Sequence, residues 1–170
     1  FDLENLQNET TYYWRVQAKN EFYLSQWSEI WNFTTFSNNV TFNINLSQGW
    51  NQISSNVICE NPNMVEVFSD ISENIVLVKN GMGLIYSPEF QINNIGDWDI
   101  TQGYQVYSNS DCVLEISGIQ VIPEDTPFEL NAGWNLIAFV HPYEVSAEIE
   151  LESILPYLII AKDNYGNIFV

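Results

Sequence analysis

Apolar and polar positions alternate in the first part of the chain. Over residues 12–19 the even positions are all apolar and include Tyr12 and Trp14. The odd positions are polar from Arg15 onward. This period of two predicts a strand with one face on a core. A loop over residues 20–28 leads to a second predicted strand at residues 30–34. Two strands and a loop are too few for a stable domain, so the segment is expected to belong to a larger one.

A nine-residue tract occurs twice. Residues 46–54 read LSQGWNQIS and residues 130–138 read LNAGWNLIA, a shift of 84 positions from 46 to 130. Self-similarity at a fixed interval is typical of units that are strung together, and such units serve more often as scaffolds or binders than as single catalysts. The tract therefore predicts a modular protein.

The pattern that follows the first tract predicts short strands and one short helix. Gly49 supplies the backbone freedom of a tight turn. Apolar residues at positions 64, 67, 68 and 71 follow the helical i, i+3, i+4, i+7 spacing. Residues 75–79 and 84–86 are expected to pair as a hairpin around a turn that contains Gly81 and Gly83. The other predicted strands cover residues 41–46, 50–57, 103–107 and 112–116.

The second copy keeps this order but is shorter. Nothing in it corresponds to Trp98 or to the predicted strand at residues 103–107, so it lacks roughly its last third. The aligned pairs are Val65 with Ile149, Ile71 with Leu155 and, after a one-residue deletion, Lys79 with Lys162 and Gly83 with Gly166.

Composition agrees with a β-rich fold. Apolar residues make up 46% of the 170 residues and aromatic residues 15%, and aromatic side chains favour pleated, half-buried surfaces. We therefore expect an all-β fold of mostly antiparallel, sandwich-like modules with one short helix per repeat. The expected domains are residues 1–36 (an incomplete β domain), 41–118 (the complete first repeat) and 119–170 (the truncated second repeat), with a polar joint at residues 36–41.

The first segment carries a family resemblance. Residues 6–18 read L-x-N-x-T-x-Y-x-W-x-V-x-A, and the pairs Trp27-Ser28 and Phe33-Thr34 follow. These residues resemble the last two strands of a fibronectin type III domain and cover about the last third of one. The resemblance implies that the hydroxyl of Tyr12 pins the corner before the penultimate strand. An unrelated hairpin is the alternative.

The repeats carry a second resemblance. Over residues 42–170 the order is GWN-x-I-S, V-F-x-D-I, V-K-N, G-x-x-Y, W, GYQVY and L-x-I-x-G. This order resembles modules of large secreted and cell-surface bacterial proteins exported by the type IX route. In those proteins the modules often follow fibronectin type III or immunoglobulin-like domains. The resemblance implies an extracellular accessory or stalk region, tied to no single reaction. Because the chain opens with Phe1, we expect it to be an excerpt whose export signal lies outside it.

The charge balance restricts the partners. Four Lys and Arg oppose 22 Asp and Glu, which gives a net charge of −18. Binding to nucleic acid requires clustered basic residues, and adsorption to an anionic membrane requires them too, so both are disfavoured. No apolar run is long enough to span a bilayer, and direct membrane insertion is not expected. The scattered acids indicate a solvated surface, with calcium binding or a salty medium as alternatives.

The chain has two cysteines, Cys59 and Cys112, and no CxxC spacing. With one histidine, zinc has too few ligands. Two hypotheses stay open: a disulfide that closes a loop of about 50 residues, worth roughly 4 kcal/mol in the loop-entropy account, or two buried free thiols. An extracellular location would permit the bridge.

Candidate catalytic groups are few. His141 is the only histidine and its counterpart in the first copy is Val57, so a Ser-His-Asp or Cys-His site encoded by the repeat is disfavoured. We expect His141 to lie at the surface or a loop edge. Asp97 and Asp99 flank Trp98 and are weak candidates for a metal or sugar site; if the segment were a strand, they would share one face about 6–7 Å apart. Otherwise Trp98 packs and the acids are solvated.

The repeated tryptophans offer a further choice. Trp50 and Trp134 could stack on sugars, but each follows a turn glycine at the start of a predicted core strand. Repetition at matched positions favours packing, so we expect both in the core. Gly81 and Gly83 resemble part of a phosphate loop but lack the Lys-Ser/Thr step and the helix. They are expected to be hairpin glycines.

These observations favour a non-catalytic structural segment of an extracellular or cell-surface bacterial protein. It would act as a stalk, adhesin segment or filament component whose partners are neighbouring domains or copies of the same protein. The alternative is a carbohydrate-binding accessory module of a secreted hydrolase that recognises polysaccharide through Trp98. Calcium-rigidified linkers are a third hypothesis. An enzyme within these residues is not expected, and no cofactor other than calcium is suggested.

Overall fold

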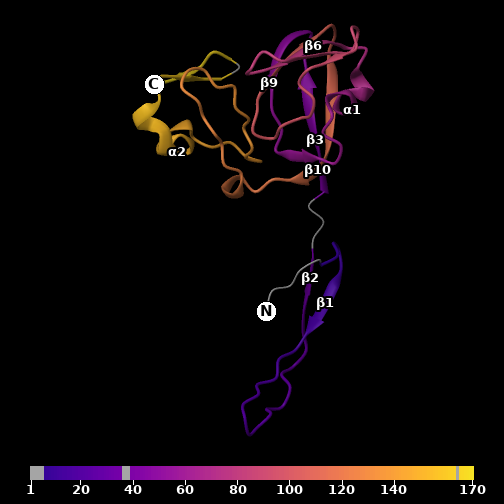
Figure 1. Ribbon diagram of the computed structural model, residues 1–170, viewed down its shortest axis with the longest axis vertical. Helices are drawn as coiled ribbons and strands as arrows, with labels where there is room; N and C mark the ends of the chain where they lie inside the picture. The colour runs from indigo at the N-terminus through magenta and orange to yellow at the C-terminus, as the bar shows by residue number, and fades with distance from the viewer. Residues whose placement is uncertain (1–5, 36–38, 164) are drawn as a thin grey trace. The chain divides into compact units, whose positions relative to one another are not determined.

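The computed structural model describes residues 6–35, 39–163 and 165–170. The chain divides into two compact units, Phe1–Asn38 and Asn39–Val170, of which the second contains both copies of the repeat. Most regular structure is in antiparallel strands, so the expected all-β, sandwich-like class is confirmed. Each copy contributes one short α-helix, α1 (Met64–Val67) and α2 (Ala147–Glu150). Figure 1 shows these elements along the chain.

The first unit is a long hairpin. Strands β1 (Thr11–Trp14) and β2 (Trp31–Thr34) pair in antiparallel register. The strand predicted over residues 12–19 ends earlier, at Trp14. Beyond it the hydroxyls of Ser28 and Ser25 accept the backbone N–H groups of Val16 and Ala18, so serine side chains replace ladder carbonyls there. The hydroxyl of Tyr12 accepts the backbone N–H of Gln7 at 2.8 Å. The polar joint predicted at residues 36–41 lies partly outside the described residues.

The first copy of the repeat is built from two sheets. Strands β3 (Asn39–Leu46), β10 (Cys112–Gln120) and β5 (Val57–Cys59) form one sheet, in which β10 is central. The second sheet has the order β4-β9-β6-β7-β8. Its strands are β4 (Gly49–Ile53), β6 (Ile75–Asn80), β7 (Ile85–Ser87), β8 (Ile92–Asn93) and β9 (Tyr104–Ser108).

One hydrophobic core joins these two sheets. Leu46 and Leu114 come from the first sheet, and Val78 and Val106 from the second, and all four belong to one buried cluster. Helix α1 adds Met64 to this cluster, and Phe68 follows the helix into it. The core is therefore a layer between two sheets, as in a sandwich.

Two predicted elements are divided in the structure. The strand predicted over residues 50–57 becomes β4 and β5, which lie in different sheets. The break occurs at Ser55, whose hydroxyl accepts the N–H of Val57 and turns the chain. The helix predicted over residues 64–71 ends at Val67, and a 3-10 helix (Ser69–Ile71) completes the segment.

The second copy is less regular. After a 3-10 helix at Pro123–Asp125, the chain reaches α2, a 3-10 helix (Glu152–Tyr157), and the two-stranded sheet of β11 (Ala161–Lys162) and β12 (Ile168–Phe169). A small cluster of Val121, Ala138 and Val140 forms its buried part. Its GWN tract forms a single isolated bridge, between Gln102 and Ile137.

Candidate binding groove of the second copy

The repeated GWN tract is a turn held by its asparagine. In the first copy, Asn51 Oδ1 accepts the N–H of Ser47 at 3.0 Å, and Asn51 Nδ2 donates to the carbonyls of Ser47 and Gly49 at 2.8 and 3.1 Å. Asn135 makes the corresponding three bonds in the second copy at 3.0, 2.8 and 3.1 Å. The turn glycine has a φ of 101° in one copy and 105° in the other, a conformation that glycine adopts at little cost. The two tracts therefore have the same local structure.

The hairpins of the two copies also correspond. Asn80 Oδ1 accepts the backbone N–H groups of residues 82 and 84, and Asp163 Oδ1 accepts those of residues 165 and 167. Lys79 pairs with Ile85 in the first copy, and Lys162 with Ile168 in the second. The first-copy glycines are hairpin glycines: Gly83 has a φ of 81° at the turn.

The helices fix where the single deletion lies. Asn63 precedes α1, and its carbonyl accepts the N–H groups of residues 66 and 67; Ser146 precedes α2 and accepts those of residues 149 and 150. The shift between these two residues is 83 positions, from 63 to 146, as it is for the hairpins. The alignment of Val65 with Ile149 is thus wrong by one residue. The deletion lies before α2, between the GWN tract and Ser146.

With this correspondence, elements of the second copy can be matched to strands of the first. In the first copy, β9 lies between β4 and β6, and β10 lies between β3 and β5. The second copy has counterparts of β4, β6 and β7, namely the GWN tract, β11 and β12. Among the described residues, β11 pairs with β12 alone, so no described strand lies on its other edge, the one that corresponds to the β9 side of β6.

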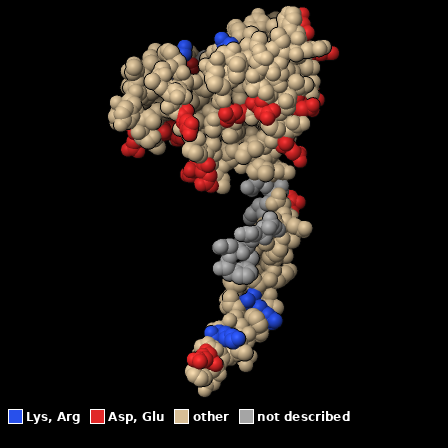
Figure 2. All heavy atoms as spheres, viewed as in Figure 1, with Lys and Arg blue, Asp and Glu red and all other residues tan. Residues whose placement is uncertain are grey.

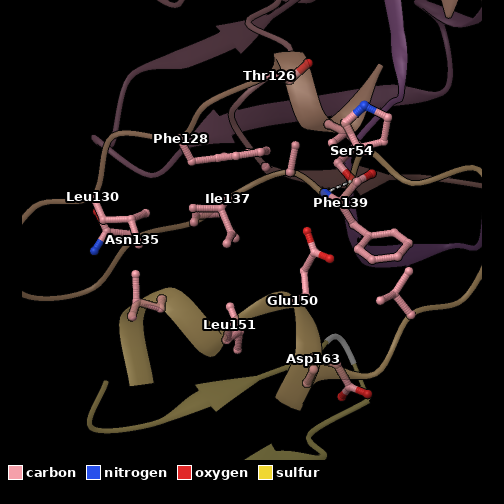
Figure 3. Close-up of a pocket in the computed structure, with 18 of the residues that line it drawn as sticks. Ser54, Thr126, Phe128, Leu130, Asn135, Ile137, Phe139, Glu150, Leu151 and Asp163 are labelled. Atoms are coloured by element: carbon pink, nitrogen blue, oxygen red, sulfur yellow. Dashed lines mark hydrogen bonds between the residues drawn. The ribbon is translucent and has the colours of Figure 1, made fainter. Parts of the chain in front are cut away.

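A groove of about 720 Å³ occupies this place. One wall is formed by Phe128, Leu130 and the end of the GWN tract with Ile137, and the facing wall by Leu151, which follows α2, and by Lys162 and Asp163 of the hairpin. Figure 3 shows Phe128 and Ile137 on one side of the open space and Leu151 on the other, with the carboxylate of Glu150 between them. The groove has apolar walls and acidic groups at its margins.

Two apolar residues of the groove are exposed where their counterparts are buried. Leu46 is 2% exposed and Ile53 8%, whereas Leu130 and Ile137, each 84 positions later, are both 41% exposed. In the first copy Leu46 pairs with Cys112 of β10, and Ile53 pairs with Tyr104 of β9. The exposed residues of the second copy are therefore the ones that β9 and β10 cover in the first.

The polar groups of the groove are held by local partners. His141 Nε2 lies 2.9 Å from Glu150 Oε1, and the imidazole contacts the rings of Phe139 and Tyr143. His141 is thus largely buried, contrary to the surface position expected. The hydrogen bond from the Asn167 side chain, joined by backbone N–H groups of the same turn, lowers the pKa of the Asp163 carboxyl below its ordinary value. Both carboxylates serve structural contacts.

Trp98 is not a surface platform. It is 6% exposed and packs against Phe68 and Tyr104, with ring centroids 6.4 and 4.4 Å away. The expectation that it stacks on a ligand is therefore wrong, because neither neighbour leaves it an open sugar-sized face. Its other predicted role, packing in the core, is the one observed.

The two acids beside Trp98 do not lie on a strand. Asp97 forms an isolated bridge with Asn63. Asp99 Oδ1 accepts the N–H and the hydroxyl of Thr101, and Asp99 Oδ2 accepts the side-chain amide of Gln102. Partial burial alone would raise the pKa of Asp99, but these three bonds hold it below its ordinary value. Within the described ranges, no three His, Cys, Asp or Glu side chains converge as a metal-binding group.

The repeated tryptophans are exposed, and the expectation that they are core residues is wrong. Trp50 is 56% and Trp134 74% exposed. Side chains alternate along β4, so Trp50 must face away from Ile53, which lies in the core. On this outer face Trp50 meets Tyr107 edge-on, at 5.2 Å between ring centroids, and Lys79 Nζ lies 5.4 Å from the ring.

The cysteines are not bridged. Both are free thiols. Cys59 pairs with Gly118 near one end of β10, and Cys112 lies at the other end of that strand. Six residues of strand separate these positions by about 20 Å, whereas a disulfide requires Cα atoms within about 7 Å. The disulfide hypothesis is therefore wrong for this fold, and free thiols are the surviving alternative.

The acidic residues do not concentrate at the groove. Figure 2 shows Asp and Glu side chains scattered singly and in small groups on the visible face of residues 39–170.

Within the described part of the chain, no helix is long and apolar enough to cross a bilayer.

No protein-family model, curated protein or solved structure matches the chain.

The groove is the feature that sequence reasoning missed. No local pattern signals it, because its walls come from segments that are separate in the sequence, among them the GWN tract of the second copy, the residues around α2 and the hairpin at Lys162 and Asp163.

Proposed function

We propose that the chain is a non-catalytic structural segment of an extracellular or cell-surface bacterial protein and acts in a stalk, adhesin or filament. The observation that carries this proposal is the duplication of three backbone-defining features, the GWN turn, the short helix and the Asn80 or Asp163 hairpin, in one compact unit. What the copies share is architecture. The side chains that could do chemistry, such as His141, are not among the shared residues.

The His141–Glu150 contact gives the sharpest test of the non-catalytic part. His141 Nε2 and Glu150 Oε1 lie 2.9 Å apart, and a His–carboxylate contact is the arrangement from which a general base is most readily built. The full chain should show no turnover of ester, peptide or glycoside substrates above that of Glu150→Gln. Turnover that Glu150→Gln abolishes, with the fold retained by circular dichroism, would overturn the proposal.

The cellular location can be tested directly. Cells that produce the full-length protein should expose this segment to antibody and to added protease while they are intact. Proteins of the cell interior, followed in the same samples, must remain protected from the protease. A segment that becomes accessible only after lysis would contradict the extracellular part of the proposal.

Carbohydrate binding remains a second candidate because of the exposed aromatic pair on β4 and β9. Trp50 and Tyr107 form an outward surface flanked by Lys79, and exposed aromatic rings can stack on sugar faces. Binding of the full chain to a polysaccharide, lost in Trp50→Ala and retained in Trp134→Ala, would support this candidate. No binding across a broad glycan array would remove it.

A further inference from the structure

We propose that the outer edge of β3 pairs with the same edge of a second copy of the chain, antiparallel and with a two-fold axis at Asn43. The inference deepens the proposed structural function and rests on it, because a filament or stalk is held together by contacts between copies. The pairing would join the β3-β10-β5 sheets of two chains into one continuous sheet. Addition of a strand to a sheet edge is a general mode of protein association.

Strand β3 offers the most extensive edge of the first copy. It ends its sheet, so one of its sides has no neighbour among the described strands. It has eight residues, whereas β5, the opposite edge of the same sheet, has three. The edges of the other sheet are β4, with five residues, and β8, with two. An edge strand presents backbone N–H and C=O groups that another strand can bind.

The composition of β3 leaves this edge unprotected. Proteins commonly block a long edge with charged side chains or proline, which prevent pairing with another chain. Strand β3 reads NVTFNINL and contains neither. Its counterpart in the second copy, residues 123–130, reads PEDTPFEL and contains two prolines and three acids. The two copies therefore differ at this position as a pairing edge differs from a blocked one.

Two apolar side chains on the inner face of β3 are incompletely covered. Leu46 is buried and Ile44 packs against the same core, so the even-numbered residues of the strand face inward. Val40 and Phe42 belong to this face, yet they are 36% and 37% exposed. A strand added beside β3 would place its own side chains against these two residues.

The alternation of β3 is complementary to itself. With the axis at Asn43, apolar residues of the inner face lie opposite apolar residues, and polar residues of the outer face lie opposite polar ones. An axis at residue 42 or 44 would instead leave Leu46 or Val40 opposite a polar residue. The pairs about Asn43 are Val40 with Leu46, Phe42 with Ile44, Thr41 with Asn45, and Asn43 with itself.

The distribution of charge permits this contact. Two chains of net charge −18 repel each other, so they approach most easily where neither strand carries an acid. On the next strand, Glu115 lies opposite Asn43. In the paired sheet the two Glu115 residues would be three strand spacings apart, about 14 Å. This distance exceeds the Debye length of about 8 Å at physiological salt, so their repulsion is largely screened.

The first test is sedimentation velocity of the full chain, from low micromolar concentration to its solubility limit. A reversible monomer–dimer equilibrium is expected, and added salt should strengthen it by screening the net charge. Asn43→Lys sets two like charges directly opposite each other and should weaken dimerisation by about tenfold or more. Asn94→Lys is the matched control, since Asn94 is exposed and lies outside β3. Circular dichroism must show both variants folded.

Cysteine cross-linking tests the register. In Asn43→Cys the two introduced thiols face each other, within the Cα separation of about 7 Å that a disulfide requires, so mild oxidation should give a covalent dimer. Asn45→Cys is the matched control on the same face of β3. Its two thiols would be four residues apart along the strands, about 14 Å, and should not cross-link. The wild type, oxidised in parallel, reports any reaction of Cys59 and Cys112.

Three outcomes would overturn the proposal. They are a chain that stays monomeric up to its solubility limit, a dimer that Asn43→Lys weakens no more than Asn94→Lys, or equal cross-linking of Asn43→Cys and Asn45→Cys. If Asn43→Lys proves unfolded, the cross-linking comparison decides. None of these outcomes concerns turnover or the exposure of the segment on intact cells, so failure of this proposal and failure of the proposed function are distinguishable.

Discussion

The hydroxyl of Tyr104 accepts the backbone N–H of Asp99 at 2.7 Å. This bond ties the first residue of β9 to the turn that follows Trp98, inside the core of the first copy. It joins an interior strand of one sheet to the loop that carries Asp97 and Asp99. The turn is thus fixed by a core residue and needs no ion to hold it.

Tyr104→Phe should destabilise the chain by about 1–3 kcal/mol, because the Asp99 N–H would lose its partner in a buried setting. The change would appear as a lower midpoint in urea unfolding followed by far-UV circular dichroism. Tyr107→Phe is the control, since Tyr107 lies on the outer face and its hydroxyl makes no such bond. Equal effects of the two variants would contradict this assignment.

The same tyrosine should make the free energy of unfolding fall as the pH becomes alkaline. Burial, as the main cause, raises the pKa of Tyr104 to about 12 from 10.0. Its contribution is fully present below the unfolded pKa and is lost as pH rises toward the folded value, since the unfolded chain releases the proton first. Between pH 10 and 12 the wild type should therefore lose stability faster than Tyr104→Phe. Parallel curves for the two proteins would refute this.

Replacement of the two turn asparagines should lower the free energy of unfolding by different amounts in the two copies. Asn51→Ala removes three hydrogen bonds where β4 joins a complete sheet, and we expect a loss of about 1–3 kcal/mol in urea unfolding. Asn135→Ala removes the same three bonds from an exposed turn beside the groove, and a loss below about 1 kcal/mol is expected. A larger loss for Asn135→Ala would show that the second copy is the more stable unit.

Replacement of Trp98 should lower the free energy of unfolding much more than replacement of Trp50. Trp98→Ala opens a cavity between Phe68 and Tyr104 and should cost about 3–5 kcal/mol. Trp50→Ala removes a ring from the outer face of the sheet, and we expect a change within about 0.5–1 kcal/mol, mostly from its contact with Tyr107. Chemical unfolding of the two variants beside the wild type measures both. Similar losses would place Trp50 in the core after all.

The thiols should stay free under oxidising conditions. Ellman titration of the unfolded chain should count both cysteines, and the mass should not change on reduction. In the folded chain Cys59 should react slowly with iodoacetamide near pH 8, because burial raises the pKa of its thiol and so depletes the reactive thiolate. Cys59→Ser identifies its share of the reaction. A mass gain of two hydrogens on reduction would show that the two cysteines are bridged and would contradict this prediction.

Local pattern was sufficient for the fold class and for most elements. Alternation predicted β1, the helical spacing predicted α1, and the glycine turn predicted the hairpin of β6 and β7 at Gly83. Each of these signals is carried by neighbouring residues, so it can be read without knowledge of the fold. The predictions that failed concern burial. Trp50 and Trp134 were expected in the core because matched positions in a repeat favour packing, but residue type and repetition do not determine which face of a sheet a side chain occupies.

The sequence alone determined that one unit occurs twice and that the unit is β-rich. These conclusions need only period, turn chemistry and self-similarity. The tertiary structure decided that β9 and β10 are interior strands of their sheets and that Leu130 and Ile137 are exposed in a groove. Strand order is set by long-range pairing, and residues 49–53 carry no local mark of which distant strand will lie beside them.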